Sequence, residues 1–191
     1  MATTSEGTVP FRGYRTWYQV VGELPAIDGT VPLLVLHGGP GVPHDYLEDL
    51  AGLADDGRAV VFYDQIGCGK SDHPDDSELW VIDTFVEELA SVRDALGLKR
   101  VHLLGHSWGG WLALEHALGR PSGLASLTLA STCASLPAFA AETRRLKESL
   151  PAEVQEVIER RRAPPMTPRT RRRRWPTTRS GSAGSIPGPS T

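Results

Sequence analysis

Cysteine is scarce in this sequence of 191 residues, which contains only Cys68 and Cys133. Two thiols without metal-ligand spacing exclude a disulfide framework and a cysteine-based metal site, so we expect both to be buried or inert. Long apolar runs are missing too. Residues 1–15 are polar, and the longest clean apolar stretch, at 33–36, is too short for a signal-peptide core or a membrane span. We therefore expect a cytoplasmic protein with no membrane partner.

Acidic residues are absent from the end of the sequence. Residues 1–159 hold all 23 acids with 11 Lys and Arg, whereas residues 160–191 hold nine Arg and no acid. The second part is rich in Arg, Pro, Ser and Gly and cannot bury enough apolar surface to offset its ordering entropy, so we expect it to be disordered. Its four arginines at 171–174 have no aromatic-rich binding fold beside them, and we expect no nucleic-acid partner.

The remainder shows a regular alternation of apolar strands and amphipathic helices. After an N-terminal hairpin at 7–21, strands are expected at 31–36, 58–64, 100–104 and 124–130. Helices are expected at 43–54, 83–96 and 108–119, and one or two more over 136–159. Asp83 is expected to cap a helix, and Gly97 to end it. Strands alternating with helices predict an α/β protein with a doubly wound, mostly parallel sheet.

The sharpest chemical motif is Gly105-His106-Ser107-Trp108-Gly109, which lies between an expected strand and an expected helix. A serine in this strand–turn–helix context is held in a strained conformation that lifts its hydroxyl out of the backbone, and the tight turn requires glycine two positions before and after it. The following helix directs its N–H groups and positive dipole end towards an oxyanion. The motif thus predicts Ser107 as a nucleophile.

A glycine-rich loop, His37-Gly38-Gly39-Pro40-Gly41, follows an earlier expected strand. Residues without side chains let a backbone N–H approach a substrate carbonyl closely, and ligands of open α/β sheets bind at this edge. We expect the loop to supply one oxyanion donor and the Trp108 N–H to supply the other. Taken alone, the same residues could form an ordinary Gly/Pro turn.

Together these blocks resemble the proline iminopeptidases, including the tricorn-interacting aminopeptidases. The likeness covers about residues 7–159, and its motifs are 37–41, the block His44-Asp45-Tyr46, 62–65 leading into 67–71, and 105–110. It implies an α/β-hydrolase fold, incomplete at the C-terminus, and removal of an N-terminal residue, preferentially proline, from a small peptide or amino-acid amide. It also implies Ser107 as the nucleophile, the N–H groups of Gly39 and Trp108 as the oxyanion hole, and no metal or organic cofactor.

A serine nucleophile needs a histidine base held by a carboxylate, and in this fold the order is Ser, acid, His. All six histidines precede or closely follow the turn, at 37, 44, 73, 102, 106 and 116, and residues 131–136 contain no acid. His106 is expected to flank the turn with its ring away from Ser107. We expect His37 to support the glycine-rich loop, together with Gly38, Pro40 and Gly41. Asp64 resembles a loop-supporting residue rather than a triad acid.

The sequence divides into three parts. We expect residues 1–135 to form the N-terminal part of a hydrolase core, 136–159 to begin a helical cap, and 160–191 to be the tail. The sudden change in composition suggests a reading frame that slipped near residue 160 in a G+C-rich gene, with a natural short form as the alternative. Reading the gene in its other frames for a late Asp and His distinguishes the two.

Three functions remain open at this point. The first is a serine aminopeptidase of the proline iminopeptidase type, impaired here because the triad acid and histidine are absent. The second is an ester or amide hydrolase that uses the same serine. The third is a catalytically inactive fragment, whose exposed sheet edge would favour aggregation.

Overall fold

The computed structural model describes residues 2–25 and 29–162. In this part of the chain, six strands form one sheet. The strands lie in the order β1-β2-β4-β3-β5-β6. Their bounds are Thr4–Phe11 (β1), Tyr14–Val21 (β2), Leu33–Leu36 (β3), Val60–Tyr63 (β4), Val101–His106 (β5) and Leu124–Ala130 (β6). The hairpin β1–β2 pairs antiparallel to β4, and the strands from β4 to β6 are parallel. This confirms the expected mostly parallel α/β sheet.

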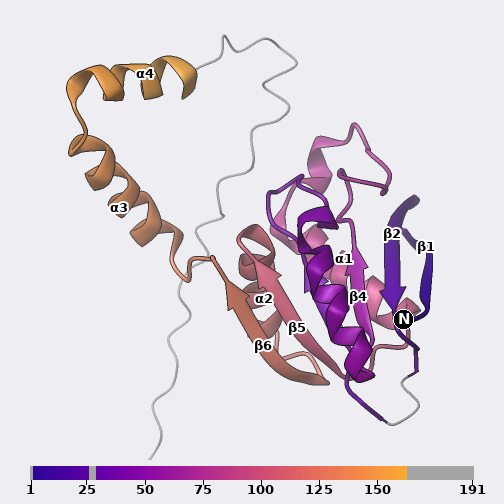
Figure 1. Ribbon diagram of the computed structural model, residues 1–191. Helices are drawn as coiled ribbons and strands as arrows, with labels where there is room; N and C mark the ends of the chain where they lie inside the picture. Colours follow the sequence, from indigo (N-terminus) through magenta and orange to yellow (C-terminus); the bar gives the residue numbers. More distant parts are fainter. Residues whose placement is uncertain (1, 26–28, 163–191) are drawn as a thin grey trace, which may run out of the picture.

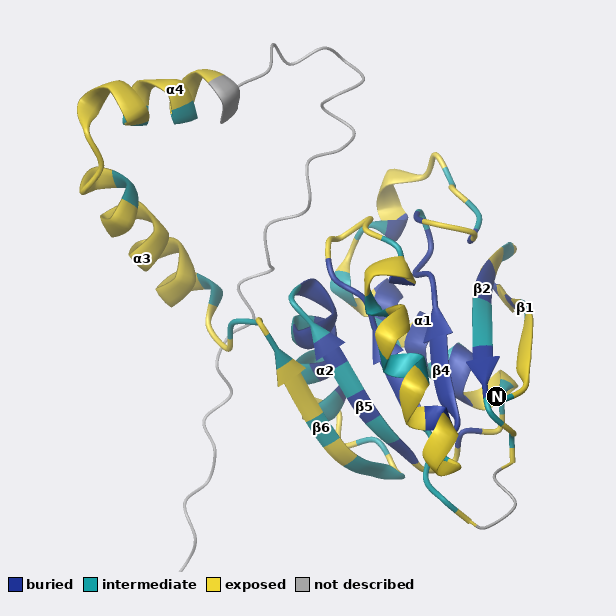
Figure 2. Ribbon diagram, viewed as in Figure 1, coloured by how far each residue is buried: buried dark blue, intermediate teal, exposed yellow. Residues whose placement is uncertain are grey.

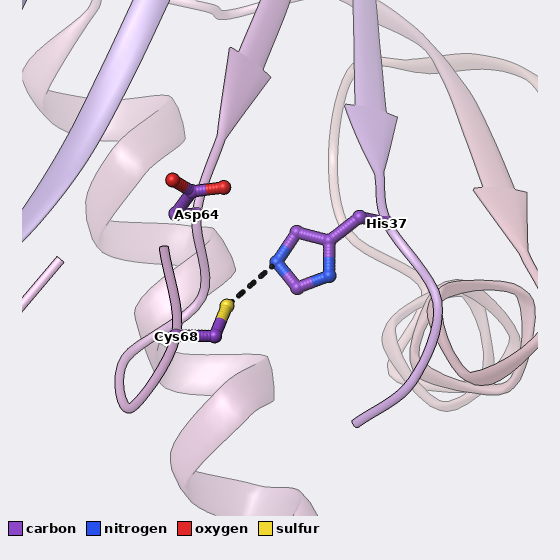
Figure 3. Close-up of side chains that lie close together, drawn as sticks. All are labelled: His37, Asp64 and Cys68. Carbon is purple, nitrogen blue, oxygen red and sulfur yellow. Dashed lines mark hydrogen bonds between the residues drawn. The ribbon is translucent and has the colours of Figure 1, made fainter. Parts of the chain in front are cut away.

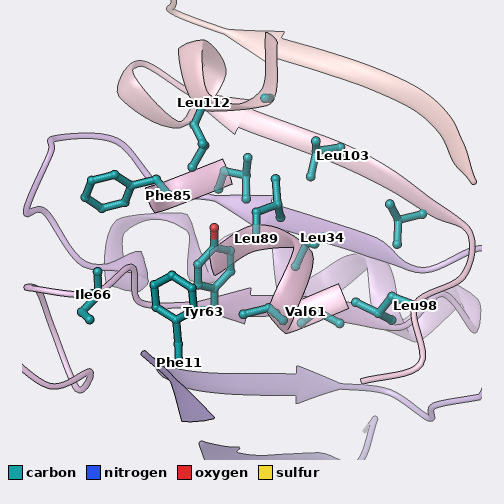
Figure 4. Packing of buried hydrophobic residues seen from close by; sticks show 14 of the residues in the cluster. Phe11, Leu34, Val61, Tyr63, Ile66, Phe85, Leu89, Leu98, Leu103 and Leu112 are labelled. Atoms are coloured by element: carbon teal, nitrogen blue, oxygen red, sulfur yellow. The ribbon is translucent and has the colours of Figure 1, made fainter. Parts of the chain in front are cut away.

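Helices cover both faces of the central strands, which explains why β3 and β4 are buried at all four positions. On one face, α1 (Ile82–Ala95) and α2 (Trp108–Leu118) pack in the larger core, where Phe85, Leu89 and Leu112 meet Leu34 and Leu103 (Figure 4). On the other face, the 3₁₀ helix η1 (His44–Asp56) covers Val35 and Phe62 with its apolar side. Figure 2 shows that the central strand β4 is buried, whereas the edge strands β1 and β6 carry exposed residues. A short 3₁₀ turn, η2 (Ser77–Leu79), precedes α1.

Two helices after β6 leave the sheet. Figures 1 and 2 show α3 (Leu136–Glu148) and α4 (Ala152–Arg162) extending from the β6 side of the molecule, and none of the residues of α3 is buried. They fall in the segment 136–159 that was expected to begin a cap, and α4 continues to Arg162. The expected disorder of the tail concerns residues that, from 163 on, lie outside the described part of the chain.

Helix α1 begins earlier than its sequence indicates. Val81, with extended backbone angles, occupies the capping position, and Asp83 lies inside the first turn, so the expectation that Asp83 caps the helix is wrong. The carboxylate still lies where the positive end of the helix dipole favours it. Gly97 adopts a φ of 64° just beyond the helix, as expected for a residue that ends it.

Candidate active site

The backbone of Ser107 is held in a rare conformation at the turn between β5 and α2. Its φ of 54° and ψ of −116° are unfavourable for a residue with a side chain. The Ser107 N–H donates to the Ala130 carbonyl at 2.9 Å, and the Ser107 carbonyl accepts from the Thr132 hydroxyl at 2.7 Å. The last residue of β6 and Thr132, just beyond it, therefore hold the two sides of the strained residue.

The two glycines of the turn are required by close backbone packing. A Cβ on Gly105 would lie 2.3 Å from the Gly109 carbonyl oxygen, and a Cβ on Gly109 would lie 2.2 Å from the Leu36 carbonyl oxygen. Neither position has a positive φ, so glycine is needed for space rather than for backbone freedom. The start of α2 thereby packs directly against the end of β3.

The glycine-rich loop follows β3 and lies beside this turn. Gly39 has a φ of 117°, and a Cβ there would lie 2.6 Å from the Gly41 nitrogen, which makes glycine the residue that fits. A Cβ on Gly38 would lie 3.1 Å from Nδ1 and 3.2 Å from the carbonyl oxygen of His106. The structure therefore brings the loop at 37–41 against the turn that carries Ser107.

His37 is fully buried beneath this loop, and both of its ring nitrogens are engaged. Nε2 accepts the Gln65 N–H at 2.9 Å, so the ring proton sits on Nδ1, which donates to the Gly38 carbonyl at 2.9 Å. Burial lowers the pKa of His37, which favours this neutral tautomer. Carbonyl and N–H of a trans peptide point in opposite directions, so the Gly39 N–H points away from His37. With both nitrogens occupied, His37 is not available as a base.

Gln65 connects His37 to the residue after the serine. Its side-chain oxygen accepts from the Trp108 indole N–H at 2.7 Å, and its side-chain nitrogen donates to the His37 carbonyl at 3.1 Å. All three side chains are buried. Because buried polar groups are costly when unpaired, this network fixes the position of the loop at 37–41 relative to Trp108 at the start of α2.

The chain brings His37, Asp64 and Cys68 together as a group of potential metal ligands (Figure 3), with donor atoms within 4.8 Å of one another. Each donor already has a protein partner. Asp64 accepts from the N–H and Nδ1 of His44 and from the Lys70 N–H, and these bonds lower the pKa of Asp64 against the opposing effect of burial.

The thiol of this group donates to the Gln65 carbonyl at 3.1 Å, and its sulfur lies 3.3 Å from Nε2 of His37. Burial raises the pKa of Cys68 strongly, so the thiol stays protonated and a poor metal ligand or nucleophile. The same burial fits the expectation of an inert Cys68. The arrangement is suited to bracing the two loops at the carboxyl ends of β3 and β4 rather than to binding a cation.

The other histidines also have partners away from Ser107. Nδ1 of His106 lies 2.8 Å from the Tyr46 hydroxyl. Nε2 of His116 accepts from Arg93 at 3.0 Å, and burial together with this cation lowers the pKa of His116 to about 4. His102 contacts the Ser126 hydroxyl at 2.7 Å, across the paired strands β5 and β6. None of these contacts joins a histidine to the Ser107 hydroxyl.

Two residues of this region received no role from the sequence. Tyr46 and Gln65 both stand inside the quoted motif blocks, and their polar side chains close to glycine-rich loops were the available signal. Tyr46 contacts the loop and the turn at once, while Gln65 joins His37 to Trp108. Their roles depend on contacts between distant segments, which a motif does not show.

Known proteins resemble this chain over most of its length. The family model described as α/β hydrolase fold matches residues 31–181. The proline iminopeptidase of Clostridium botulinum is 44% identical over 155 residues, covering 81% of this chain and 52% of that protein. That of Heyndrickxia coagulans is 47% identical over 156 residues, covering 82% and 53%.

Solved structures agree with the sequence relatives. The proline iminopeptidase of Mycobacterium smegmatis superposes with a TM-score of 0.72 at 44% identity, covering 82% of this chain and 53% of that one. The structure of VinJ superposes with a TM-score of 0.75 at 42% identity and the same coverage.

The chain thus spans about half the length of the curated relatives that it matches. The expected resemblance to proline iminopeptidases is confirmed. Because the family model covers most of the sequence and the sheet is mostly parallel, as expected, the chain belongs to the α/β-hydrolase fold family.

Proposed function

We propose that this chain supplies the nucleophile and the oxyanion hole of a serine aminopeptidase that releases N-terminal proline from small peptides or amino-acid amides. The observation that carries the proposal is the strained backbone of Ser107 at a strand–helix turn, directly beside the loop at 37–41. The named relatives support the substrate class, since several curated proteins similar to this chain are proline iminopeptidases.

In this proposal the Ser107 hydroxyl attacks the carbonyl carbon of the N-terminal residue. A bond forms between Oγ and carbon, and the carbonyl oxygen becomes an oxyanion that accepts from the N–H groups of Gly39 and Trp108. The N-terminus of α2 adds its positive dipole end. Collapse of this intermediate releases the shortened peptide as an amine and leaves an acyl-enzyme, which water hydrolyses.

The attack also requires an acceptor for the hydroxyl proton. His37 uses both ring nitrogens in the loop, and the hydrogen bonds of the other five histidines lead to groups other than Ser107. No histidine among the described residues therefore hydrogen-bonds to the Ser107 hydroxyl. We propose that residues 1–191 alone therefore react slowly with a substrate or probe, with the residual reactivity that an oxyanion hole gives without a complete triad.

A fluorophosphonate probe tests this proposal on residues 1–191. We expect slow, stoichiometric labelling that Ser107→Ala abolishes. Ser126→Ala is the matched control, because Ser126 is an exposed serine of β6 whose hydroxyl contacts His102 and lies outside the β5–α2 turn. Labelling that persists in Ser107→Ala, or a folded wild-type chain that is never labelled, would contradict the assignment.

Chromogenic substrates test the reaction class. Release of nitroaniline from proline p-nitroanilide, dependent on Ser107, supports an aminopeptidase. Turnover of p-nitrophenyl esters without turnover of the proline amide would instead identify an ester hydrolase. A folded chain inert to probe and to both substrates would identify a non-catalytic fragment.

A further inference from the structure

One hydroxyl group contacts both the glycine-rich loop and the serine turn. Tyr46 lies in η1, and its oxygen accepts the Gly38 N–H at 2.7 Å. The same oxygen lies 2.8 Å from Nδ1 of His106, the residue before Ser107. The two rings meet edge to face, with centroids 5.2 Å apart.

Burial of the ring does not explain this contact. Tyr46 is 45% exposed, so much of its side chain remains in solvent while its hydroxyl makes two short contacts. Partial desolvation raises the pKa of Tyr46, so the hydroxyl keeps its proton. Because the oxygen already accepts from the Gly38 N–H, its proton can be donated to Nδ1 of a neutral His106.

The absence of a side chain at position 38 is a second, independent observation. Gly38 has no positive φ, so its backbone does not require glycine. A Cβ there would lie 2.9 Å from the Tyr46 hydroxyl oxygen and 3.1 Å from Nδ1 of His106. A side chain at this position would therefore push apart the two groups that meet over it.

Gly38 is held on both sides by these contacts. Its N–H donates to Tyr46 and its carbonyl accepts from His37, so the orientation of the peptide that follows, which contains the Gly39 N–H, is restrained twice. An oxyanion donor is useful only when it is placed to within about 0.5 Å. A link from this peptide to the serine turn would fix the distance between the Gly39 N–H and the Ser107 hydroxyl.

We propose that Tyr46 is a positioning residue, whose hydroxyl ties Gly38 of the loop to His106 of the turn and so fixes the Gly39 N–H relative to the Ser107 hydroxyl. The inference rests on the roles proposed above for Ser107 and Gly39. It concerns the hydroxyl group alone, because a phenylalanine ring would preserve the edge-to-face contact.

Tyr46→Phe in the full chain tests the proposal, with Tyr14→Phe, in the N-terminal hairpin, as the matched control. Nuclear magnetic resonance measures amide exchange at Gly38 and the ring nitrogen signals of His106. We expect Gly38 to exchange about fivefold faster in Tyr46→Phe and the His106 Nδ1 signal to move, since one hydrogen bond is lost. His106→Ala combined with Tyr46→Phe should add little to either single variant, because all three groups share one contact.

The rate of fluorophosphonate labelling measures the consequence for Ser107. We expect it to fall about tenfold in Tyr46→Phe and to stay unchanged in Tyr14→Phe. Unchanged Gly38 exchange and His106 signals in Tyr46→Phe would overturn the tie, and altered signals with an unchanged labelling rate would overturn its positioning role. If wild-type Ser107 is never labelled, the proposed aminopeptidase fails, and the resonance measurements alone still decide whether Tyr46 ties the loop to the turn.

Discussion

The glycines around Ser107 are the clearest case at the residue scale of a sequence motif explained by atomic distances. A methyl group on Gly109 would overlap the carbonyl oxygens of Leu36 and His37, at 2.2 and 2.5 Å. Both belong to backbone that is fixed by the sheet and the loop. Relief would require α2 to move away from β3, which would also displace the Ser107 turn.

Gly109→Ala is therefore expected to destabilise the chain by about 3 kcal/mol or more, the upper range for inserting atoms into packed structure. Gly52→Ala is the matched control, because a Cβ at position 52 meets nothing within 4 Å and the residue has no positive φ. Urea unfolding followed by circular dichroism measures both variants. Equal midpoints for the two would show that α2 does not pack on β3 as described.

Glu88 is a fully buried acid on α1, with one satisfied and one unsatisfied oxygen. Oε1 accepts from the Thr16 hydroxyl at 2.5 Å and the Ile66 N–H at 2.8 Å, whereas Oε2 has no partner among the described residues. Burial raises the pKa of Glu88 to about 7, although the two hydrogen bonds favour ionisation. The folded chain thus prefers the protonated acid, which can remain in an apolar core.

This pKa predicts a loss of stability as pH rises. In the unfolded chain Glu88 releases its proton near its ordinary pKa of 4.5, whereas in the folded chain it does so near 7. Between these values the unfolded state binds fewer protons, so the free energy of unfolding falls with increasing pH, by at most roughly 3 kcal/mol. Below pH 4.5 Glu88 is protonated in both states, and the contribution of its raised pKa to the free energy of unfolding is fully present.

Glu88→Gln should remove this dependence while keeping an acceptor for Thr16 and Ile66. We expect the stability of the variant relative to wild type to increase between pH 4.5 and 7.5, as measured by urea unfolding at each pH. His116 acts in the opposite sense, since its lowered pKa makes the folded chain lose stability as pH falls from 6.5 towards 4. Both proteins contain it, so its effect cancels. A constant difference at all pH values would contradict a raised pKa for Glu88.

At the scale of elements, the sequence predicts most of the fold because the central strands are continuously apolar. The segments 31–36 and 58–64 indicate strands buried on both faces, and the structure places the strands that they contain, β3 and β4, at the centre of the sheet. The conformation of η1 could not be read in this way. Its apolar residues have helical spacing, but the difference between an α helix and a 3₁₀ helix depends on how the chain packs against β4.

The candidate site also contains some residues that the sequence predicts and others that only the fold reveals. Ser107 and its glycines are predicted because they form one contiguous motif between an expected strand and an expected helix. The network of His37, Gln65 and Trp108 joins segments 28 and 43 residues apart, and Tyr46 lies 60 residues from His106. Residue types alone do not specify which of these polar groups meet, so the fold must be known first.

The edge strand β6 is expected to control the association of the isolated chain. β6 pairs only with β5 in the described sheet, and Leu129 is 41% exposed along it. An open, apolar strand edge favours pairing with other chains. Leu129→Lys should therefore reduce concentration-dependent association, measured by light scattering, and Leu118→Lys is a control at an exposed apolar residue on a helix. Equal effects of the two substitutions would show that general surface apolarity, not the strand edge, drives association.

At the scale of the whole molecule, the proposed nucleophile and the proposed oxyanion donors are assembled by residues 31–132, while the chain matches only about half of its relatives' length. The exposed apolar side chains beyond β6 include Phe139, Leu146 and Val157. They have no core to join among the described residues. We infer that the site needs a further polypeptide segment both to cover these surfaces and to supply a base.

This inference predicts complementation by the rest of a relative. In the experiment, residues 1–191 are produced together with the segment of the Mycobacterium smegmatis proline iminopeptidase that they do not match. We expect this mixture to hydrolyse proline p-nitroanilide at least about a hundredfold faster than residues 1–191 alone, because a general base typically contributes 10²–10⁴-fold. Ser107→Ala in the mixture should abolish the gain, whereas Ser126→Ala should preserve it. Activity of the added segment alone, or a gain that survives Ser107→Ala, would show that Ser107 is not the nucleophile. Co-purification without any gain would show that the surfaces fit but that the base does not reach the hydroxyl, which would contradict the proposed geometry.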